Sequence, residues 1–326
     1  MNQGRRRSSS ARGPSAGGES LELSPVPPFD FPLSAAIFSG GDPQIRSYSD
    51  GTFRQVLRDR ERLFLAVVTG SGTVDDPVVH LRLGPGPVDR QAFRDAGDLV
   101  RRIFNLDLDI SPFPAAVRDD PVMSAIARRL RGLKPPRTST VFEALVDSII
   151  EQQISLAAAH SIEKRVVRTF GDTLEWEGDE YYAFPAPVRL AEASPEELRA
   201  CGLSLKKAEY IVGISRRIRD GGLDLENHGP GEDTETIVRE LTNIRGVGLW
   251  TAELAALRGL SRLDAIPADD LGIRRSISNY YSRVSRIDTE EARRIAEAWG
   301  EWKGLAAYYL LVAERLGIGI PDVKIG

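Results

Sequence analysis

The first hundred residues alternate short apolar runs with turn residues, a pattern that predicts a small antiparallel sheet. Between Phe29 and Leu83 the runs are Ile45–Ser49, Thr52–Leu57, Leu63–Val68 and Val78–Leu83. Asp50-Gly51 and Gly70-Ser71-Gly72 supply two of the turns. Apolar residues then recur at helical spacing from Ala92 to Phe104. We therefore expect one helix to cover a face of the sheet.

After Pro112 the apolar spacing becomes helical and stays so to the end of the chain. The helices predicted are Pro121–Leu130, Val141–Glu151, Leu156–Phe170, Pro187–Glu192, Pro195–Ala200, Lys206–Asp220, Thr234–Leu241, Leu249–Leu257, Leu271–Tyr281, Thr289–Trp299 and Lys303–Leu316. Residues 1–20 are rich in Gly, Ser and Arg and predict a disordered tail. The fold expected is α+β, with a β-rich N-terminal domain over residues 21–112 packed on an all-α body over residues 113–326.

Composition narrows the possible functions. No apolar run approaches the roughly 20 residues of a membrane-spanning helix, and the N-terminus lacks the apolar stretch of a signal peptide. We expect a monomer that stays in the cytoplasm, or in the nucleus of a eukaryote, without contact with a membrane. The single cysteine, Cys201, excludes an internal disulfide and a four-cysteine metal site.

Charge argues against a protein that grips DNA through massed lysines, because the formal net charge is -4. A protein with this net charge would have to bind DNA through small local groups of residues instead. One candidate is a run of five cations without an intervening acid, Arg128, Arg129, Arg131, Lys134 and Arg137, although such a run is more often a solvated face.

The segment Leu241–Glu253 predicts a tight reversal between two helices, because Gly246 and Gly248 interrupt it. Glycine permits left-handed backbone angles and lets a phosphate approach main-chain N–H groups. The second helix adds its positive N-terminal end. Such a hairpin could hold a DNA phosphate without lysines, whereas a plain interhelical turn is the alternative.

Asp270 stands at the predicted start of a helix, twenty residues after Trp250 and just beyond Pro267 and Asp269. An aspartate there caps the helix, and the helix dipole favours its negative charge. A fixed carboxylate also suits the stabilisation of positive charge on a sugar as its base departs.

These residues resemble the helix-hairpin-helix (HhH-GPD) DNA glycosylases, and among them most of all 3-methyladenine DNA glycosylase II of the AlkA type. The likeness is carried by G-V-G-x-W-T-A followed by a Pro-acid-Asp run at this spacing. It extends over further stretches at Phe142–Ala159, Phe184–Lys207, Ala252–Gly259 and Ala298–Tyr308. The all-α body is thus expected to be a helix-hairpin-helix glycosylase domain, acting on double-stranded DNA that contains damaged bases.

The resemblance implies a role for each matching position. Asp270 matches the catalytic aspartate, and Gln153 falls where a residue wedges into the duplex as the base flips out. The DNA-binding set is completed by Gly246, Val247, Gly248 and Thr251. Family hairpins also hold a monovalent cation through main-chain carbonyls, which here would belong to Thr242, Ile244 and Val247; no catalytic cofactor is implied.

Trp250 occupies the position at which strand-cleaving relatives carry a lysine nucleophile, so the resemblance implies base removal by water alone, which leaves an abasic site. The implied base pocket contains Trp250, Leu254 and Leu311. The AlkA type stacks its cationic base on several aromatics, and the two leucines stand where further aromatics would align.

Several alternatives remain at the level of sequence. The lesion could be alkylated, or it could be 8-oxoguanine, hypoxanthine or uracil. The chain could instead be an inactive DNA-binding module, or an all-α interaction protein whose hairpin binds nothing. His80, His160 and His228 lie too far apart in the sequence to suggest a shared metal site or a triad.

Overall fold

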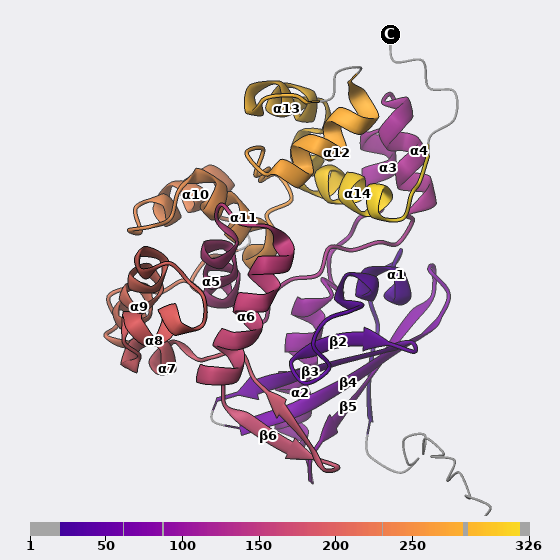
Figure 1. The fold of residues 1–326 in the computed structure, drawn as a ribbon. Coiled ribbons are helices and arrows are strands. Elements are labelled where there is room, and N and C mark those ends of the chain that lie inside the picture. Colours follow the sequence, from indigo (N-terminus) through magenta and orange to yellow (C-terminus); the bar gives the residue numbers. More distant parts are fainter. Residues whose placement is uncertain (1–19, 61, 87, 230, 283–285, 320–326) are drawn as a thin grey trace, which may run out of the picture.

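The computed structural model describes residues 20–60, 62–86, 88–229, 231–282 and 286–319. The predicted tail lies outside these residues except for Ser20, which begins the first strand. Among the described residues, no helix combines the length and the apolar character that crossing a membrane requires. Figure 1 shows a sheet at one end of the molecule and helices over the rest.

The N-terminal sheet has five antiparallel strands in the order β1-β5-β4-β3-β2. Its strands are β1 Ser20–Leu23, β2 Arg46–Ser49, β3 Thr52–Asp59, β4 Arg62–Gly72 and β5 Pro77–Gly84. Short helical turns follow β1 at α1 Phe31–Ala35 and η1 Ala36–Phe38. The four strands predicted from alternation are confirmed, whereas β1 was missed because it adjoins a polar segment.

The predicted helix after the sheet is confirmed as α2 Arg90–Ile103, which contacts β1, β3 and β5. Beneath it lies an apolar core containing Phe31, Phe53 and Phe104. The rings of Phe53 and Phe104 meet edge to face with centroids 4.9 Å apart, a favourable aromatic geometry. One face of the sheet is therefore closed by α2.

The remaining helices form the larger part of the molecule. They are α3 Phe113–Ala116, α4 Pro121–Arg129, α5 Val141–Glu151, α6 Leu156–Phe170, α7 Pro187–Glu192, α8 Pro195–Ala200, α9 Leu205–Arg219, α10 Thr234–Thr242, α11 Leu249–Leu260, α12 Leu271–Tyr281, α13 Thr289–Ala296, η2 Glu297–Trp302 and α14 Lys303–Arg315. Most begin where an Asp, Ser or Thr side chain accepts a first-turn amide hydrogen, as Thr140 does for α5 and Ser155 for α6. Polar caps in the sequence thus set the helix starts.

The helices divide between two apolar cores. One core is formed by α5, α6, α9, α10 and α11. The other contains α3, α4, α12 and α14 around Trp299 and Tyr309. Figure 1 shows α3 and α4 beside α12 and α14, although most of the chain separates them in sequence. The connection from α11 to α12 runs from the first core to the second and carries Asp270.

A β-hairpin interrupts the half of the chain that was predicted to be entirely helical. It consists of β6 Thr173–Trp176 and β7 Asp179–Tyr182, joined by Glu177 and Gly178 at positive φ. Trp176 packs on the N-terminal sheet so closely that a Cβ on Gly84 would lie 2.6 Å from its ring. The hairpin shares a small core with Val56, Leu65 and Val67. It therefore covers the sheet face opposite α2, and the prediction of helices alone was wrong here.

The five-cation run begins in the last turn of α4 and is only partly exposed: Arg128, Arg129 and Arg131 are exposed, whereas Lys134 and Arg137 are not. Lys134 is fully buried, and its Nζ donates to the carbonyls of Val26 (2.7 Å) and Leu106 (3.0 Å). Arg137 donates to the Gly259 carbonyl, and Arg131 pairs with Asp75. These contacts satisfy backbone carbonyls and join the sheet domain to the helices. The idea that this run grips DNA is therefore not supported for its buried members.

Candidate functional site

The turn between α10 and α11 requires glycine at one of its two glycine positions. Gly246 has φ +93°, and a Cβ there would lie 2.2 Å from the ring of Tyr210 on α9. Gly248 is the N-cap of α11 with φ -88°, and a Cβ there would meet nothing within 4 Å. Gly246 thus lets the turn pack on α9, while Gly248 keeps the end of α11 open. No side chain caps that end, so its first-turn amides can face an anion.

The loop after α5 is anchored on this turn. Gln152 donates through Nε2 to the Gly246 carbonyl (3.1 Å) and to Thr251 Oγ1 (3.0 Å). Lys207 on α9 donates through Nζ to the carbonyls of Ile150 (3.0 Å) and Gln152 (2.6 Å) at the end of α5. The Thr251 side chain is 2% exposed. Its hydroxyl therefore holds the loop from inside, while the role of Thr251 in the predicted DNA-binding set stays a prediction.

Because the neighbouring Gln152 is anchored in this way, the side chain of Gln153 is left exposed. It adopts φ +58°, which non-glycine residues seldom do, and its side chain is exposed. Ile154 and Leu156 beside it are also exposed, at 38% and 56%. Gln152 and Lys207 hold the strained position in place. Gln153 is therefore exposed next to Gln152, which contacts the hairpin turn, although sequence reasoning did not identify the residues that fix it there.

Asp270 is the N-cap of α12, as the sequence predicted. Its Oδ1 accepts hydrogen bonds from the amides of Gly272 (2.8 Å) and Ile273 (3.0 Å). A Cβ on Gly272 would lie 3.0 Å from Asp270 Oδ1 and 3.4 Å from Leu311 Cδ2. Leu311 on α14 therefore lies beside the carboxylate. The absence of a side chain at position 272 leaves room for both groups.

Trp250, Leu254 and Arg258 share one face of α11, because they are spaced four residues apart. Leu254 is buried, and Trp250 is half-buried. The indole Nε1 of Trp250 is buried without a hydrogen-bond partner among the described residues. These three residues, which we call the Trp250 stripe, run along α11 from the hairpin toward Asp270.

Arg258 is the last residue of this stripe and was not identified from the sequence. Its guanidinium donates to Glu151 Oε1 at 2.6 Å. Burial lowers the pKa of Arg258, but Glu151, Asp147 and Asp270 together raise it above its ordinary value. The negative charge of Asp270 thus acts on this arginine. Burial raises the pKa of Tyr308, and the positive charges of Arg315 and Arg258 oppose this effect. Tyr308 packs against the core that contains Trp299 and Tyr309.

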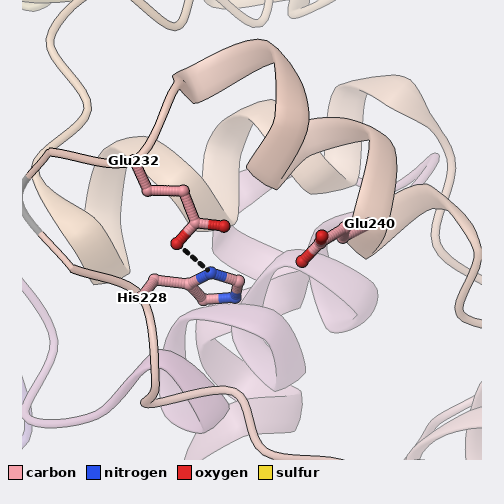
Figure 2. Close-up of side chains that lie close together, drawn as sticks. All are labelled: His228, Glu232 and Glu240. Atoms are coloured by element: carbon pink, nitrogen blue, oxygen red, sulfur yellow. Dashed lines mark hydrogen bonds and ion pairs between the residues drawn. The ribbon is translucent and has the colours of Figure 1, made fainter.

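Two places in the described residues offer ligands to a cation. The first is the hairpin, where the Ile244 carbonyl already accepts the Val247 amide at 3.0 Å; a carbonyl has a second lone pair for an ion. The second groups His228, Glu232 and Glu240, whose ligand atoms lie within 4.8 Å of one another (Figure 2). His228 Nδ1 is 3.0 Å from Glu232 Oε2, so a hydrogen bond accounts for that pair. Spacing in the sequence could not reveal this cluster, because its partners are glutamates.

Comparison with known proteins gives consistent results. Residues 146–301 match the HhH-GPD superfamily base excision DNA repair protein family. A DNA-3-methyladenine glycosylase of Bacillus subtilis (strain 168) is 34% identical over 226 residues, which are 69% of this chain and 74% of that protein. DNA-3-methyladenine glycosylase 2 of Escherichia coli (strain K12) is 27% identical over 291 residues, covering 88% and 95% of the two chains.

The fold has a close counterpart among solved structures. The 3-methyladenine DNA-glycosylase from Archaeoglobus fulgidus superposes with a TM-score of 0.78 and 25% identity. The match covers 91% of this chain and 99% of that one. The β-rich domain and the helical body are therefore shared with that structure as a whole.

Proposed function

The chain belongs to the HhH-GPD superfamily of base excision DNA repair proteins, and we propose that it is a monofunctional DNA glycosylase. It hydrolyses the N-glycosidic bond of a damaged base that has flipped out of duplex DNA, and it leaves an abasic site. The observation that carries this proposal is the position of Asp270. The carboxylate lies at the start of α12, beside Leu311 and within the electrostatic reach of Arg258 on the Trp250 stripe.

The hairpin positions the DNA backbone in this mechanism. The open N-terminus of α11 and the amides around Gly246, Val247 and Gly248 bind a phosphate, which explains how a chain of net charge -4 holds DNA. Gln153, fixed at positive φ, enters the stack that the flipped base has left. Trp250 then packs on the extruded base.

Asp270 serves the bond-breaking step. As the bond between sugar and base breaks, its electron pair leaves with the base and positive charge develops on the sugar. The fixed carboxylate stabilises that charge. Water adds to the sugar carbon and releases its extra proton to the solvent. Hydrolysis of this kind needs no catalytic cofactor. Because Trp250 stands where a lysine nucleophile would form a Schiff base, the enzyme does not cut the strand.

The substrate we favour is an alkylated base, since the relatives named above are 3-methyladenine glycosylases. Leu254 and Leu311 give this pocket less aromatic surface than stacking on a cationic base would use. The alternative substrates are 8-oxoguanine, hypoxanthine and uracil. An inactive DNA-binding protein would be the alternative outside the enzyme class.

The remaining features of the proposal concern partners. One chain carries the hairpin, the wedge and Asp270, so we propose that it works as a monomer on double-stranded DNA. Its place of action is the compartment that holds the chromosome, the bacterial cytoplasm or a eukaryotic nucleus. A monovalent cation bound by the carbonyls of Thr242, Ile244 and Val247 would strengthen the phosphate site.

The test is a base-release assay on duplexes carrying each lesion, with wild type and Asp270→Asn. Asparagine still caps α12, so the variant keeps its melting temperature, whereas loss of the charge slows release by roughly 100-fold. Asp269→Asn is the matched control, because Asp269 is exposed and accepts from Thr289 at 2.6 Å. Unchanged release by Asp270→Asn would refute the catalytic assignment, and no release from any lesion would favour the inactive module.

A further inference from the structure

A cavity remote from the hairpin lies where the C-terminal end of α11 meets α2. Its volume is about 520 Å³, and its lining includes Arg101, Arg102, Arg137, Arg262 and Ser261. The helix α11 has 12 residues, which places this cavity about 18 Å along its axis from Gly248. DNA held by the hairpin therefore meets the opposite end of the helix.

Several hydrogen-bonding groups of this cavity are buried without partners. They are Arg102 Nε, Arg137 Nε and Ser261 Oγ, none of which has a hydrogen-bond partner among the described residues. Another nitrogen of each guanidinium group is already used: Arg102 and Arg137 both donate through Nη2 to the Gly259 carbonyl. Ser261 is held at φ +58° as the C-cap of α11. Buried polar groups are rarely left unpaired unless a ligand completes them.

The charge balance of the cavity also favours an anion. Asp107 pairs with Arg101 at 2.7 Å, and Glu226 pairs with Arg102 at 3.1 Å. Among the ion pairs of the described residues, none involves Arg137. Burial and the positive charges of Arg102 and Arg262 together lower the pKa of Arg137 to about 10, although Glu226 opposes them. An anion here would relieve the repulsion among these cations.

We propose that this cavity binds a phosphate group, either inorganic phosphate or the phosphate of a mononucleotide. Phosphate offers several acceptor oxygens to the Nε groups of Arg102 and Arg137 and to the Ser261 hydroxyl, and arginine recognises it with good geometry. The cavity volume is ample for a phosphate with an attached nucleoside. The proposal does not rest on the glycosylase activity, because none of these residues belongs to the hairpin or the Asp270 site.

The test measures the binding of inorganic phosphate and of dAMP by isothermal titration calorimetry, against sodium chloride of equal ionic strength. Arg137→Gln removes a charged donor and should weaken both ligands by about tenfold or more. Ser261→Gly removes the hydroxymethyl side chain and with it the hydroxyl donor, and glycine suits φ +58°, so this variant folds and should bind several-fold more weakly. Arg118→Gln, at a side chain 75% exposed on the surface, is the control that should bind like wild type.

Duplex DNA without a lesion distinguishes the source of the phosphate. Its affinity should be the same for wild type, Arg137→Gln and Ser261→Gly. The proposal is overturned if phosphate and dAMP bind no better than chloride, or if Ser261→Gly and Arg137→Gln bind them as wild type does. A loss of duplex affinity in the two variants would assign the cavity to the DNA backbone and contradict a small-molecule ligand.

Discussion

At the scale of single residues, Asp147 is a buried acid whose acidic neighbours add to the cost of ionising it. It is 8% exposed in the middle of α5, and its Oδ1 has no hydrogen-bond partner among the described residues. Burial, together with the charges of Glu163 and Glu143, raises its pKa well above the ordinary value, although Arg46 opposes this. The folded protein therefore retains a proton on Asp147 that the unfolded chain releases above about pH 4.

The difference in bound protons between the folded and unfolded states decides how the free energy of unfolding changes with pH. Between the two pKa values the folded state binds more protons than the unfolded state, so the free energy of unfolding falls as pH rises. Asp147→Asn fixes the neutral form. We expect it to raise the melting temperature relative to wild type at pH 8 and to have little effect at pH 4, as measured by scanning calorimetry. A gain of equal size at both pH values would show that ionisation of Asp147 is not its cause.

At the scale of elements, the two glycines of the helix-hairpin-helix unit have different structural roles. Gly246→Ala would force a side chain into φ +93° and into the ring of Tyr210. We expect it to lower the free energy of unfolding by about 2 kcal/mol or more. Urea unfolding followed by tryptophan fluorescence measures this change.

Gly248→Ala is the matched variant, because its Cβ would meet no protein atom. It should lose at most about 1 kcal/mol of stability, the effect of alanine at an N-cap. Its methyl group would stand where the phosphate approaches α11, so duplex affinity should fall while the fold persists. Equal stability losses in the two variants would contradict this division of roles.

For the molecule as a whole, ion pairs hold the sheet domain on the helices. Arg46 on β2 pairs with Glu143 on α5 at 2.8 Å and with Glu163 on α6 at 3.2 Å. The Glu143 side chain is 3% exposed, so removing its partner would leave a buried carboxylate uncompensated. Arg46→Met should therefore cost roughly 3–5 kcal/mol of unfolding free energy.

A double variant distinguishes the loss of unfolding free energy that comes from the unpaired charge from the loss that comes from packing. Adding Glu143→Gln to Arg46→Met should recover part of the loss, because it removes one of the unpaired charges. Both variants are compared with wild type by chemical unfolding. If the double variant is no more stable than Arg46→Met alone, the loss comes from packing of the arginine stem rather than from the buried charge.

The local signals of the sequence determined much of this protein. Period-two alternation predicted four of the five strands of the N-terminal sheet, β2 to β5, and capped helical periodicity predicted the helices from α4 to α14 with ends that agree to within a few residues. Asp270 was placed at a helix start, and the structure confirms that it caps α12. These features depend on neighbouring residues along the chain, which is why the sequence alone could predict them.

Tertiary structure decided whatever depends on residues distant in sequence. The β6–β7 hairpin is short and polar on its edges, and it is stabilised by Trp176 packing on Gly84. Arg258 acquires its role through Glu151 on another helix, and Thr251 turns inward because Gln152 lies beside it. These contacts depend on how the helices pack. Packing brings together residues that no sequence pattern connects, so the sequence alone could not predict them.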